Sequence, residues 1–422
     1  MSKTAPERPG RLLGANRDFT LLWSGQSVAA LGSTSCMVAY PLLILDVTHS
    51  PAQVGLVMAV GVIARLVVGL PAGVFVDRCD KRRLMLACGA GQLVTQAILV
   101  SAVAGHWVSI GLVLAVEIVG ATLATFFGIA EETAVRQVVR TDQLPLALAR
   151  SEARGAAAVL AGPPLGGLLF ALAPVFPFAA NAASSLVSLA CIAFIRTPMP
   201  STLTARAATV GWWSVGGREL VSGLRWIWHQ PFLRVTLLLI SGNNLVSNAL
   251  SIIAIVVSGQ RGDSAATTGL LMTFAGVGTL AGALFAPRLV QRLSVRTILV
   301  ANRCLWAALI PLFLVVDSTY VIGALFAVMF AMGPTGSTAV TTHQMGVTPP
   351  ELQGRASSAR GFFTSLAAPI GLGLAGFSLG HFGLVVSVLS LTAWVILMAV
   401  IATVSRAIRS PSAAQRSSGK TR

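Results

Sequence analysis

Two charged residues stand inside long apolar runs of this sequence, where a charge is costly. Glu117 lies in the apolar run 108–130, and Arg65 lies in the run 53–76. On membrane-insertion scales a charged residue at mid-depth costs about 3 kcal/mol, so neither side chain is expected to face lipid. A buried carboxyl can take up and release a proton, which makes Glu117 a candidate proton carrier. A structural ion pair between Glu117 and Arg65 is the alternative, and both remain open.

Other charged residues lie nearer the ends of apolar runs. Glu131 and Glu132 follow the run that contains Glu117, close to Arg136. One of the two is a candidate partner for Arg78, and capping of a helix end in solvent is the alternative. We therefore add Glu131 to the candidate charge relay.

Arg303 and Arg360 lie about two turns and one turn inside the edge of their apolar runs. Long arginine side chains near a membrane edge extend their guanidinium groups toward water while their methylene stems stay in apolar surroundings. We expect this snorkelling for both residues.

The sequence contains none of the common catalytic motifs. It has no G-x-x-x-x-G-K-[ST] nucleotide loop, no G-x-S-x-G nucleophile turn and no H-E-x-x-H metal motif. Its five cysteines have neither C-x-x-C nor Cys/His spacing. We therefore expect no enzymatic activity, no use of ATP, no metal and no cofactor.

The composition indicates a lipid environment. Of the 422 residues, 55% are hydrophobic and only 10% are charged, whereas soluble proteins carry about 25% charged residues. The net charge of +16 comes from short basic clusters between apolar runs. Nucleic-acid binding would need a basic patch on one face beside a recognised motif, so this distribution argues against it.

Stretches of about 20 mainly apolar residues, the length that a helix needs to cross a bilayer, recur along the chain. They are 19–45, 53–76, 83–104, 108–130, 148–172, 175–195, 233–257, 266–287, 296–316, 320–341, 356–379 and 383–405. The predicted fold class is an all-α membrane protein with twelve transmembrane helices.

Lys and Arg gather in every second connection between these stretches. They lie in the N-terminal segment, at 78–83, 136–150, 196–234 and 288–296, at 355, and in the C-terminal segment, whereas the other connections hold only Arg261. Basic residues stay on the cytoplasmic side of a membrane. We therefore expect a multi-pass protein of the bacterial inner membrane with both termini in the cytoplasm.

The long connection in the middle of the chain separates two halves. The predicted organisation is a cytoplasmic N-terminus 1–18, a six-helix bundle 19–195, a linker 196–232, a six-helix bundle 233–405 and a disordered cytoplasmic tail 406–422. Four tryptophans among basic residues at 212–228 are typical of a helix that lies in the membrane interface. A G-x-x-x-G pair ends the second stretch and another ends the eighth, so we expect two pseudo-symmetric halves.

The first of these pairs opens the most specific motif. Gly69 and Gly73 lie one helical turn apart, which lets a neighbouring helix approach closely. Asp77 follows at the membrane edge, where it can dock on the positive end of a helix. The basic cluster after it consists of Arg78, Arg82 and Arg83.

This stretch resembles the signature loop between the second and third spans of the major facilitator superfamily. The resemblance implies a fold of two six-helix bundles and a gating role, because in that family the loop latches the two halves in one state of the transport cycle. The second copy keeps Arg288 and Arg292 but has Ala286 in place of the aspartate, so only the first copy is complete.

The stretch Gly162-Pro163-Pro164-Leu165-Gly166-Gly167 resembles the G-P-x-x-G-G element that marks proton-coupled exporters of this superfamily. The glycines remove side chains from one side and Pro163 removes a hydrogen bond, so a bent, smooth helix could seal the path against leak. A generic small-residue packing stripe is the alternative. The phrases N-R-D-F at 16–19 and S-P-A-Q at 50–53 extend the resemblance to the macrolide-efflux and enterobactin-exporter-like branch.

The resemblance implies a central cavity lined by spans one, four, seven and ten. Its candidate walls are weakly polar: Ser33, Thr34, Ser35, Tyr40, Thr122, Thr125, Asn244, Asn248, Thr335, Ser337 and Thr338, together with Glu117. The asparagines of span seven could bond either a substrate or a neighbouring helix. Because several buried charges are lacking, a strongly ionic substrate such as a phosphate ester, which would need an arginine pair, is not expected.

Together these features predict a secondary active transporter that exports amphipathic organic compounds, such as drugs or secondary metabolites, by alternating access and proton antiport. The proton gradient is the expected energy source. The alternatives are an uptake carrier for a nutrient or lipid with the same fold, and a non-transporting membrane scaffold. The expected partners are a small-molecule substrate and the lipid bilayer, without nucleic acid or ATP, and we expect a monomer.

Overall fold

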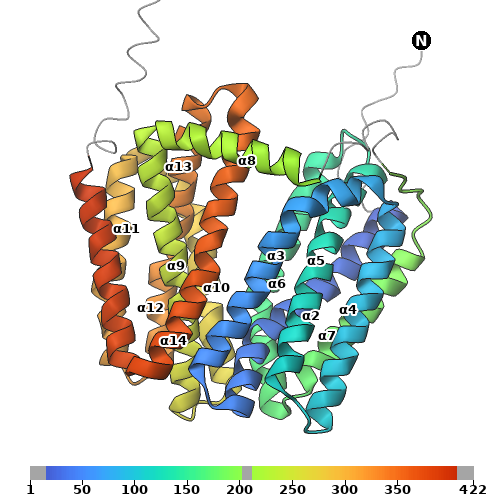
Figure 1. The fold of residues 1–422 in the computed structure, drawn as a ribbon, viewed down its shortest axis with the longest axis horizontal. Helices are drawn as coiled ribbons and strands as arrows, with labels where there is room; N and C mark the ends of the chain where they lie inside the picture. Colours follow the sequence, from blue (N-terminus) through green and yellow to red (C-terminus); the bar gives the residue numbers. More distant parts are fainter. Residues whose placement is uncertain (1–15, 202–211, 406–422) are drawn as a thin grey trace, which may run out of the picture. The chain divides into compact units, whose positions relative to one another are not determined.

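The computed structural model describes residues 16–201 and 212–405 of the chain. Within these residues every regular element is a helix (Figure 1). The predicted tail 406–422 and nearly all of the predicted N-terminal segment 1–18 lie outside the described residues.

Six long helices make up the described part of the first half. They are α2 (Arg17–Thr48), α3 (Pro51–Arg78), α4 (Lys81–Ala104), α5 (Ile110–Val138), α6 (Leu144–Leu172) and α7 (Phe176–Ala193). Each is long and apolar enough to cross a membrane, as the sequence predicted.

The second half begins with α8 (Trp212–His229), which is not among the candidate membrane spans. It continues with α9 (Pro231–Gln260), α10 (Ala265–Arg292), α11 (Val295–Leu309), the 3₁₀ turn η2 (Ile310–Leu314), α12 (Thr319–Ala331), α13 (Gly333–Val347) and α14 (Pro350–Val404).

The predicted tenth span is interrupted in the structure. The helix α12 ends at Ala331 and α13 begins at Gly333, directly before Pro334. A proline inside a helix lacks an N–H donor and its ring clashes with the carbonyl four residues earlier, which favours a break at this point. Together α12 and α13 form one candidate membrane span, 319–347.

The described residues contain eleven candidate membrane spans, and the last of these is α14. A continuous helix of its 55 residues would be about 80 Å long, far more than the roughly 30 Å of a bilayer core. Gly383 interrupts it with φ +77° and ψ −179°, a conformation essentially restricted to glycine. The chain reverses there (Figure 1), so α14 holds two arms, and this fits the twelve predicted spans.

Polar residues before several helices fix where those helices begin. Asp80 accepts a hydrogen bond from the Arg83 amide at 2.8 Å and so caps α4. Ser109, Ser264 and Ser294 cap α5, α10 and α11 in the same way. An oxygen at this position satisfies one of the first free amides of a helix.

The described residues group into two compact units. The first contains residues up to Leu43 and the range Val67–Trp213, and the second contains Ile44–Leu66 and the chain from Ser214 onward. The first part of α3 therefore packs with the second half. There Gly55 approaches α14 so closely that a Cβ on it would lie 2.8 Å from the Cα of Gly376.

The helix α8 is docked onto the second unit. Ile227 is buried in a cluster with Phe232 and Ala356, and a Cβ on Gly223 would collide with the carbonyl of Arg355. Trp228 remains half exposed. The membrane-interface position predicted for this helix stays a prediction.

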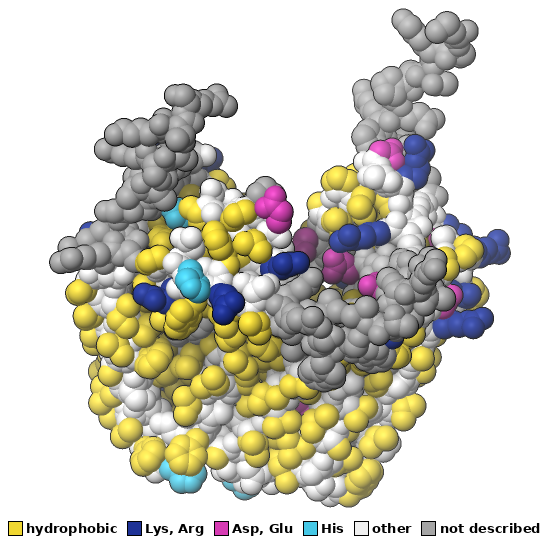
Figure 2. All heavy atoms as spheres, turned by 45° about the horizontal axis from the view of Figure 1, so that its top comes forward, with side chains coloured by type: hydrophobic (Ala, Val, Ile, Leu, Met, Phe, Trp, Pro, Cys, Tyr) yellow, Lys and Arg dark blue, Asp and Glu magenta, His cyan; other side chains and the backbone are white. Residues whose placement is uncertain are grey.

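The visible surface of each unit is largely apolar. Figure 2 shows hydrophobic side chains covering the sides of both units, with Lys and Arg gathered toward one end. Large side chains such as Leu172, Leu284 and Val315 are exposed. Soluble proteins rarely expose such continuous apolar surface, so this surface indicates contact with lipid.

Candidate functional site

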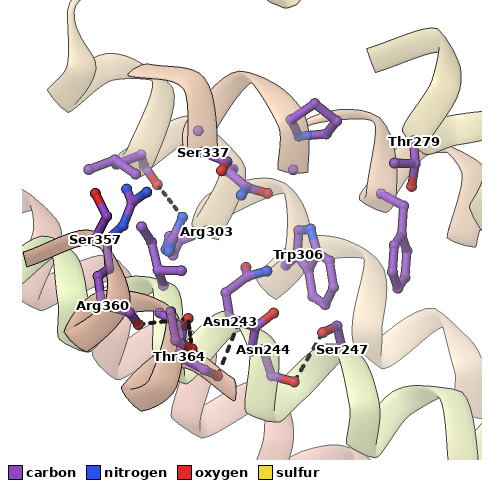
Figure 3. Close-up of a pocket in the computed structure, with 18 residues that line it drawn as sticks. Asn243, Asn244, Ser247, Thr279, Arg303, Trp306, Ser337, Ser357, Arg360 and Thr364 are labelled. Atoms are coloured by element: carbon purple, nitrogen blue, oxygen red, sulfur yellow. Dashed lines mark hydrogen bonds between the residues drawn. The ribbon is translucent and has the colours of Figure 1, made fainter. Parts of the chain in front are cut away.

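A cavity of about 400 Å³ lies within the second unit. This is the size of pocket that typically holds a drug-sized molecule. The labelled residues of Figure 3 reach it from α9, α10, α11, α13 and α14: Asn243, Asn244, Ser247, Thr279, Arg303, Trp306, Ser337, Ser357, Arg360 and Thr364.

Arg303 is the most buried charged residue of this cavity. Its side chain is only 4% exposed, and its guanidinium donates to the carbonyl oxygens of Leu239 at 2.8 Å and Leu299 at 3.5 Å. The snorkelling that the sequence predicted for Arg303 is therefore wrong. The helix α11 turns this residue toward α9 and the cavity, where two backbone carbonyls hold its guanidinium.

Arg360 lines the same cavity from α14. Its Nη1 donates to Thr341 Oγ1 of α13 at 2.9 Å. In Figure 3 the Arg360 side chain runs from α14 toward the side of the cavity on which Arg303 lies. The argument against a strongly ionic substrate assumed that the membrane part lacks a pair of arginines. This assumption is wrong, because tertiary packing brings Arg303 and Arg360, which are 57 positions apart in the sequence, to one cavity.

The break between α12 and α13 forms part of the cavity wall. Gly333, Pro334, Gly336 and Ser337 all line it. Broken helices at a binding site are common in secondary transporters, and the start of a half-helix carries a partial positive charge. Trp306 and Phe330 also line the cavity and provide aromatic surface, with ring centroids 5.5 Å apart.

Some of the residues predicted to line a cavity lie in this pocket, and others do not. Asn244 lines the pocket and also donates to the Thr364 carbonyl of α14 at 3.3 Å, so it bonds a neighbouring helix, and its bonding to a substrate stays a prediction. Asn248 donates to the Asn244 carbonyl of its own helix at 2.8 Å. Ser337 lines the pocket, whereas Thr338 is exposed beside it.

The cavity residues that the sequence predicted in the first unit do not line this pocket. Tyr40 is buried, its ring packs edge-on against Phe178 at 5.2 Å, and its hydroxyl accepts from Gln96 at 3.3 Å. Tyr40 is therefore packed within the first unit, and its place in a cavity between the halves stays a prediction. Ser33 is exposed with its hydroxyl bonded to the Ala30 carbonyl. Thr122 lies half-buried on α5.

The candidate charge relay is only partly assembled within one unit. Glu131 of α5 forms an ion pair of 2.7 Å with Arg154 of α6, and both side chains are about 15% exposed. Glu132 pairs instead with Arg136 at 3.4 Å on the surface. The sequence analysis did not single out Arg154 as a partner for Glu131.

Glu117 is half-buried on α5, a helix of the first unit. It is close enough to Cys36 of α2 to interact with it electrostatically. Arg65 of α3 has an exposed side chain and belongs to the other unit. The proton-carrier and ion-pair roles for these two residues stay predictions.

A family model described as "Transmembrane secretion effector" matches residues 14–421. The chain belongs to this family of major facilitator transporters. The multidrug efflux pump Tap of Mycolicibacterium fortuitum is 28% identical to it over 399 residues, which cover 89% of this chain and 92% of Tap.

Solved structures agree with this membership at the level of the fold. A bacterial homologue of the human lysosomal transporter Spinster superposes with a TM-score of 0.70 at 14% identity, over 94% of this chain and 98% of that one. A bacterial homologue of the iron transporter ferroportin gives 0.71 at 14% identity, over 92% and 98%. Because the chain belongs to this family, it is a multi-pass membrane transporter with a small-molecule substrate, and it is not an enzyme.

The stretch 162–167 packs α6 against α2. A Cβ on Gly162 would collide with Thr34, and a Cβ on Gly166 would collide with the Ser35 carbonyl. The Thr34 hydroxyl also donates to the Ala158 carbonyl of α6 at 2.9 Å. Pro163 and Gly167 are buried in the same helix, so the motif acts at least as a close-packing stripe, and its role as a leak seal stays a prediction.

The glycines of the gating motif behave differently from those of its second copy. A Cβ on Gly73 would meet no described atom within 4 Å, and one on Gly69 would meet only Thr125 Cγ2, at 3.9 Å. A close approach by another helix at these two glycines therefore stays a prediction. Such an approach is present at Gly278 and Gly282, whose added Cβ atoms would collide with the carbonyls of Ala327 and Ala331.

The basic cluster of the motif holds the end of α7. Arg82 donates to the Ala193 carbonyl at 2.6 Å and to the Ile192 carbonyl at 3.3 Å. Cations at a helix C-terminus satisfy its last carbonyls and its dipole. Arg83 extends an exposed side chain, and the gating roles of Asp77 and Arg78 stay predictions.

Proposed function

We propose that this transporter is a secondary active exporter of amphipathic organic compounds and that it works by alternating access with proton antiport. The observation that carries the proposal is the relation to a multidrug efflux pump over nearly the full length of both chains. The buried Gly162 and Pro163 of the export motif add to it, because this element marks proton-coupled exporters.

The pocket chemistry agrees with an amphipathic substrate. Trp306 and Phe330 offer aromatic surface, while Asn243, Asn244 and Ser337 offer hydrogen-bonding groups in the same cavity. Ligand sites that accept drug-like molecules combine apolar walls with a few placed polar groups.

Proton exchange needs a group that changes protonation during the cycle. Glu117 is the candidate, because it is a half-buried carboxyl in the middle of a membrane span. Replacement by Gln keeps the shape and hydrogen-bonding capacity of the side chain but removes the titrating proton. Glu132 on the same helix is an exposed carboxyl and provides a matched control.

The test uses the full chain expressed in a bacterium that lacks its main efflux pumps. A panel of amphipathic antibiotics and dyes identifies compounds whose inhibitory concentration rises at least about fourfold. Everted vesicles energised by respiration should then accumulate such a compound, and its addition should dissipate part of the pH gradient, as reported by acridine orange fluorescence.

In the Glu117→Gln variant the compound-dependent proton release should disappear, whereas Glu132→Gln should behave like the native protein. Unchanged coupling in Glu117→Gln would remove this residue from the proton pathway. Accumulation in right-side-out vesicles, and none in everted ones, would replace export by uptake.

A further inference from the structure

The cavity of the second unit has a basic lining without a compensating acid. Eighteen residues line it, and two of them, Arg303 and Arg360, are arginines, whereas none is aspartate or glutamate. Ion pairs within 4.0 Å among the described residues include neither arginine. The lining therefore carries a formal charge of about +2 at neutral pH, because arginine is always protonated there.

The few acids of the second half are engaged elsewhere. After residue 232 the sequence has only three, namely Asp263, Asp317 and Glu351. Asp263 accepts hydrogen bonds from Ser258 and Thr319, and Asp317 faces Arg261 at 4.0 Å. Glu351 is exposed in the first turn of α14. None of these three carboxylates therefore forms an ion pair with Arg303 or Arg360.

A guanidinium as deeply buried as that of Arg303 is unfavourable without an anion. Its hydrogen bonds go to two backbone carbonyls, which satisfy some of its N–H groups but do not neutralise its charge. Two like charges that line one cavity add mutual repulsion. An anion placed between them would remove both penalties, since carboxylates and phosphates match the planar fork of arginine.

A second, independent feature of the cavity points to a ligand. Asn302 is only 3% exposed, it lines the cavity, and its Oδ1 has no hydrogen-bond partner among the described atoms. Buried amide oxygens are almost always bonded in native proteins. A ligand that carries a hydroxyl or N–H group beside its acidic group would satisfy this oxygen.

We propose that this cavity binds the acidic group of an amphipathic organic acid, with Arg303 and Arg360 holding its carboxylate or similar oxyanion. The inference rests on the proposed export function and narrows its substrates to organic anions. Trp306 and Phe330 receive the apolar part of the molecule, and Asn302 accepts a hydrogen bond from a neutral polar group. The cavity should therefore bind an acid more tightly than a neutral compound of the same shape.

The test measures binding and not transport, so it is independent of the export assay. The full-length protein, purified into phosphatidylcholine nanodiscs, is titrated with 1-pyrenebutyrate, whose emission reports energy transfer from tryptophan. The neutral probe 1-pyrenebutanol has the same ring and chain. Loss of a charge-assisted contact costs about tenfold or more in affinity, so the native protein should prefer the acid by at least about tenfold.

The variants Arg303→Gln and Arg360→Gln should each lower the affinity for pyrenebutyrate to near that for pyrenebutanol. Arg360→Lys should retain part of the preference, because it keeps the charge. Arg355→Gln is the matched control, since Arg355 is an exposed arginine of the same helix that does not line the cavity. If Arg303→Gln fails to fold, Arg360→Gln alone carries the test.

Equal affinity of the native protein for the acid and the alcohol would overturn the proposal. An acid preference that Arg355→Gln abolishes as strongly as Arg360→Gln would also overturn it, because a diffuse surface charge would then be responsible. Displacement of pyrenebutyrate by phosphatidylglycerol in the nanodisc would assign the cavity to a lipid headgroup and not to a transported acid.

Discussion

At the scale of single residues, the ion pairs of this transporter differ most in their burial. Glu131 and Arg154 join α5 to α6 with side chains that are about 15% exposed, whereas those of Glu132 and Arg136 are 68% and 60% exposed. A buried pair is costly to break because the remaining charge is left in a low-dielectric region, while a surface pair contributes little.

This contrast gives a residue-scale prediction. Glu131→Gln should destabilise the protein by about 3 kcal/mol because it strands the Arg154 charge. Glu132→Gln should change stability by less than about 1 kcal/mol. Thermal unfolding in detergent, followed by fluorescence, measures both. Equal effects of the two variants would mean that the Glu131 pair is as well solvated as the surface pair.

The double variant Glu131→Gln, Arg154→Gln provides the matching control. It removes both charges together, so its stability should recover most of the loss caused by Glu131→Gln alone. If Glu131 acts mainly in the charge relay, transport should stay impaired in the double variant although stability returns.

At the scale of elements, close helix packing follows from contact geometry and not from the G-x-x-x-G pattern. The second copy packs α10 against α12, with Gly278 and Gly282 facing the carbonyls of Ala327 and Ala331. The first copy has the same spacing, yet a Cβ on Gly73 would meet no atom within 4 Å among the residues that the structure describes. The pattern allows a neighbour to approach, but the neighbour must be supplied by the rest of the fold.

The element-scale prediction compares these two glycines. Gly282→Ala should destabilise the protein strongly, because a Cβ would collide with backbone that cannot move aside. Gly73→Ala should leave stability unchanged or raise it slightly, since alanine favours a helix by about 1 kcal/mol over glycine. Thermal unfolding of the two variants in detergent checks the order.

Transport by Gly73→Ala then reports on a conformation other than the one described. A folded, stable and inactive Gly73→Ala protein would support the gating role of the 69–83 motif. A stable variant with full transport would leave Gly73 without a packing role in any state of the cycle.

At the scale of the whole molecule, acidic residues are distributed unevenly between the halves. Only three of the 14 acids follow residue 232, and the candidate proton carrier Glu117 belongs to the first half. The two arginines that line the cavity belong to the second half. Under our two proposals, proton coupling and recognition of an acidic substrate are thus assigned to different halves of the chain.

This division predicts separable defects. Glu117→Gln should bind 1-pyrenebutyrate with an affinity within about twofold of the native protein, because Glu117 does not line the cavity and substitutions at sites without shared partners behave additively. Arg360→Gln should lose the binding preference but keep proton release with any neutral substrate that it still transports. Nanodisc titrations and vesicle proton-release assays on the same two variants measure this. A common loss of both activities in both variants would argue for one shared site.

The sequence by itself determined the membrane class, the number of apolar stretches and the family. These depend on hydropathy, on loop charge and on local motifs such as Asp77-Arg78, which are properties of neighbouring residues. It also located the break near 380–382 between the last two stretches, although the structure makes the turn at Gly383 and not through a loop.

Only the tertiary structure decided which charges line one cavity. Arg303 and Arg360 each look like an edge residue in a linear reading, since distance from the end of an apolar run says nothing about the face of a helix. Packing of α14 against both α9 and α11 brings the two side chains to one cavity. The same holds for Tyr40, which is polar in sequence yet buried against Phe178, because neighbours far along the chain determine what a side chain faces.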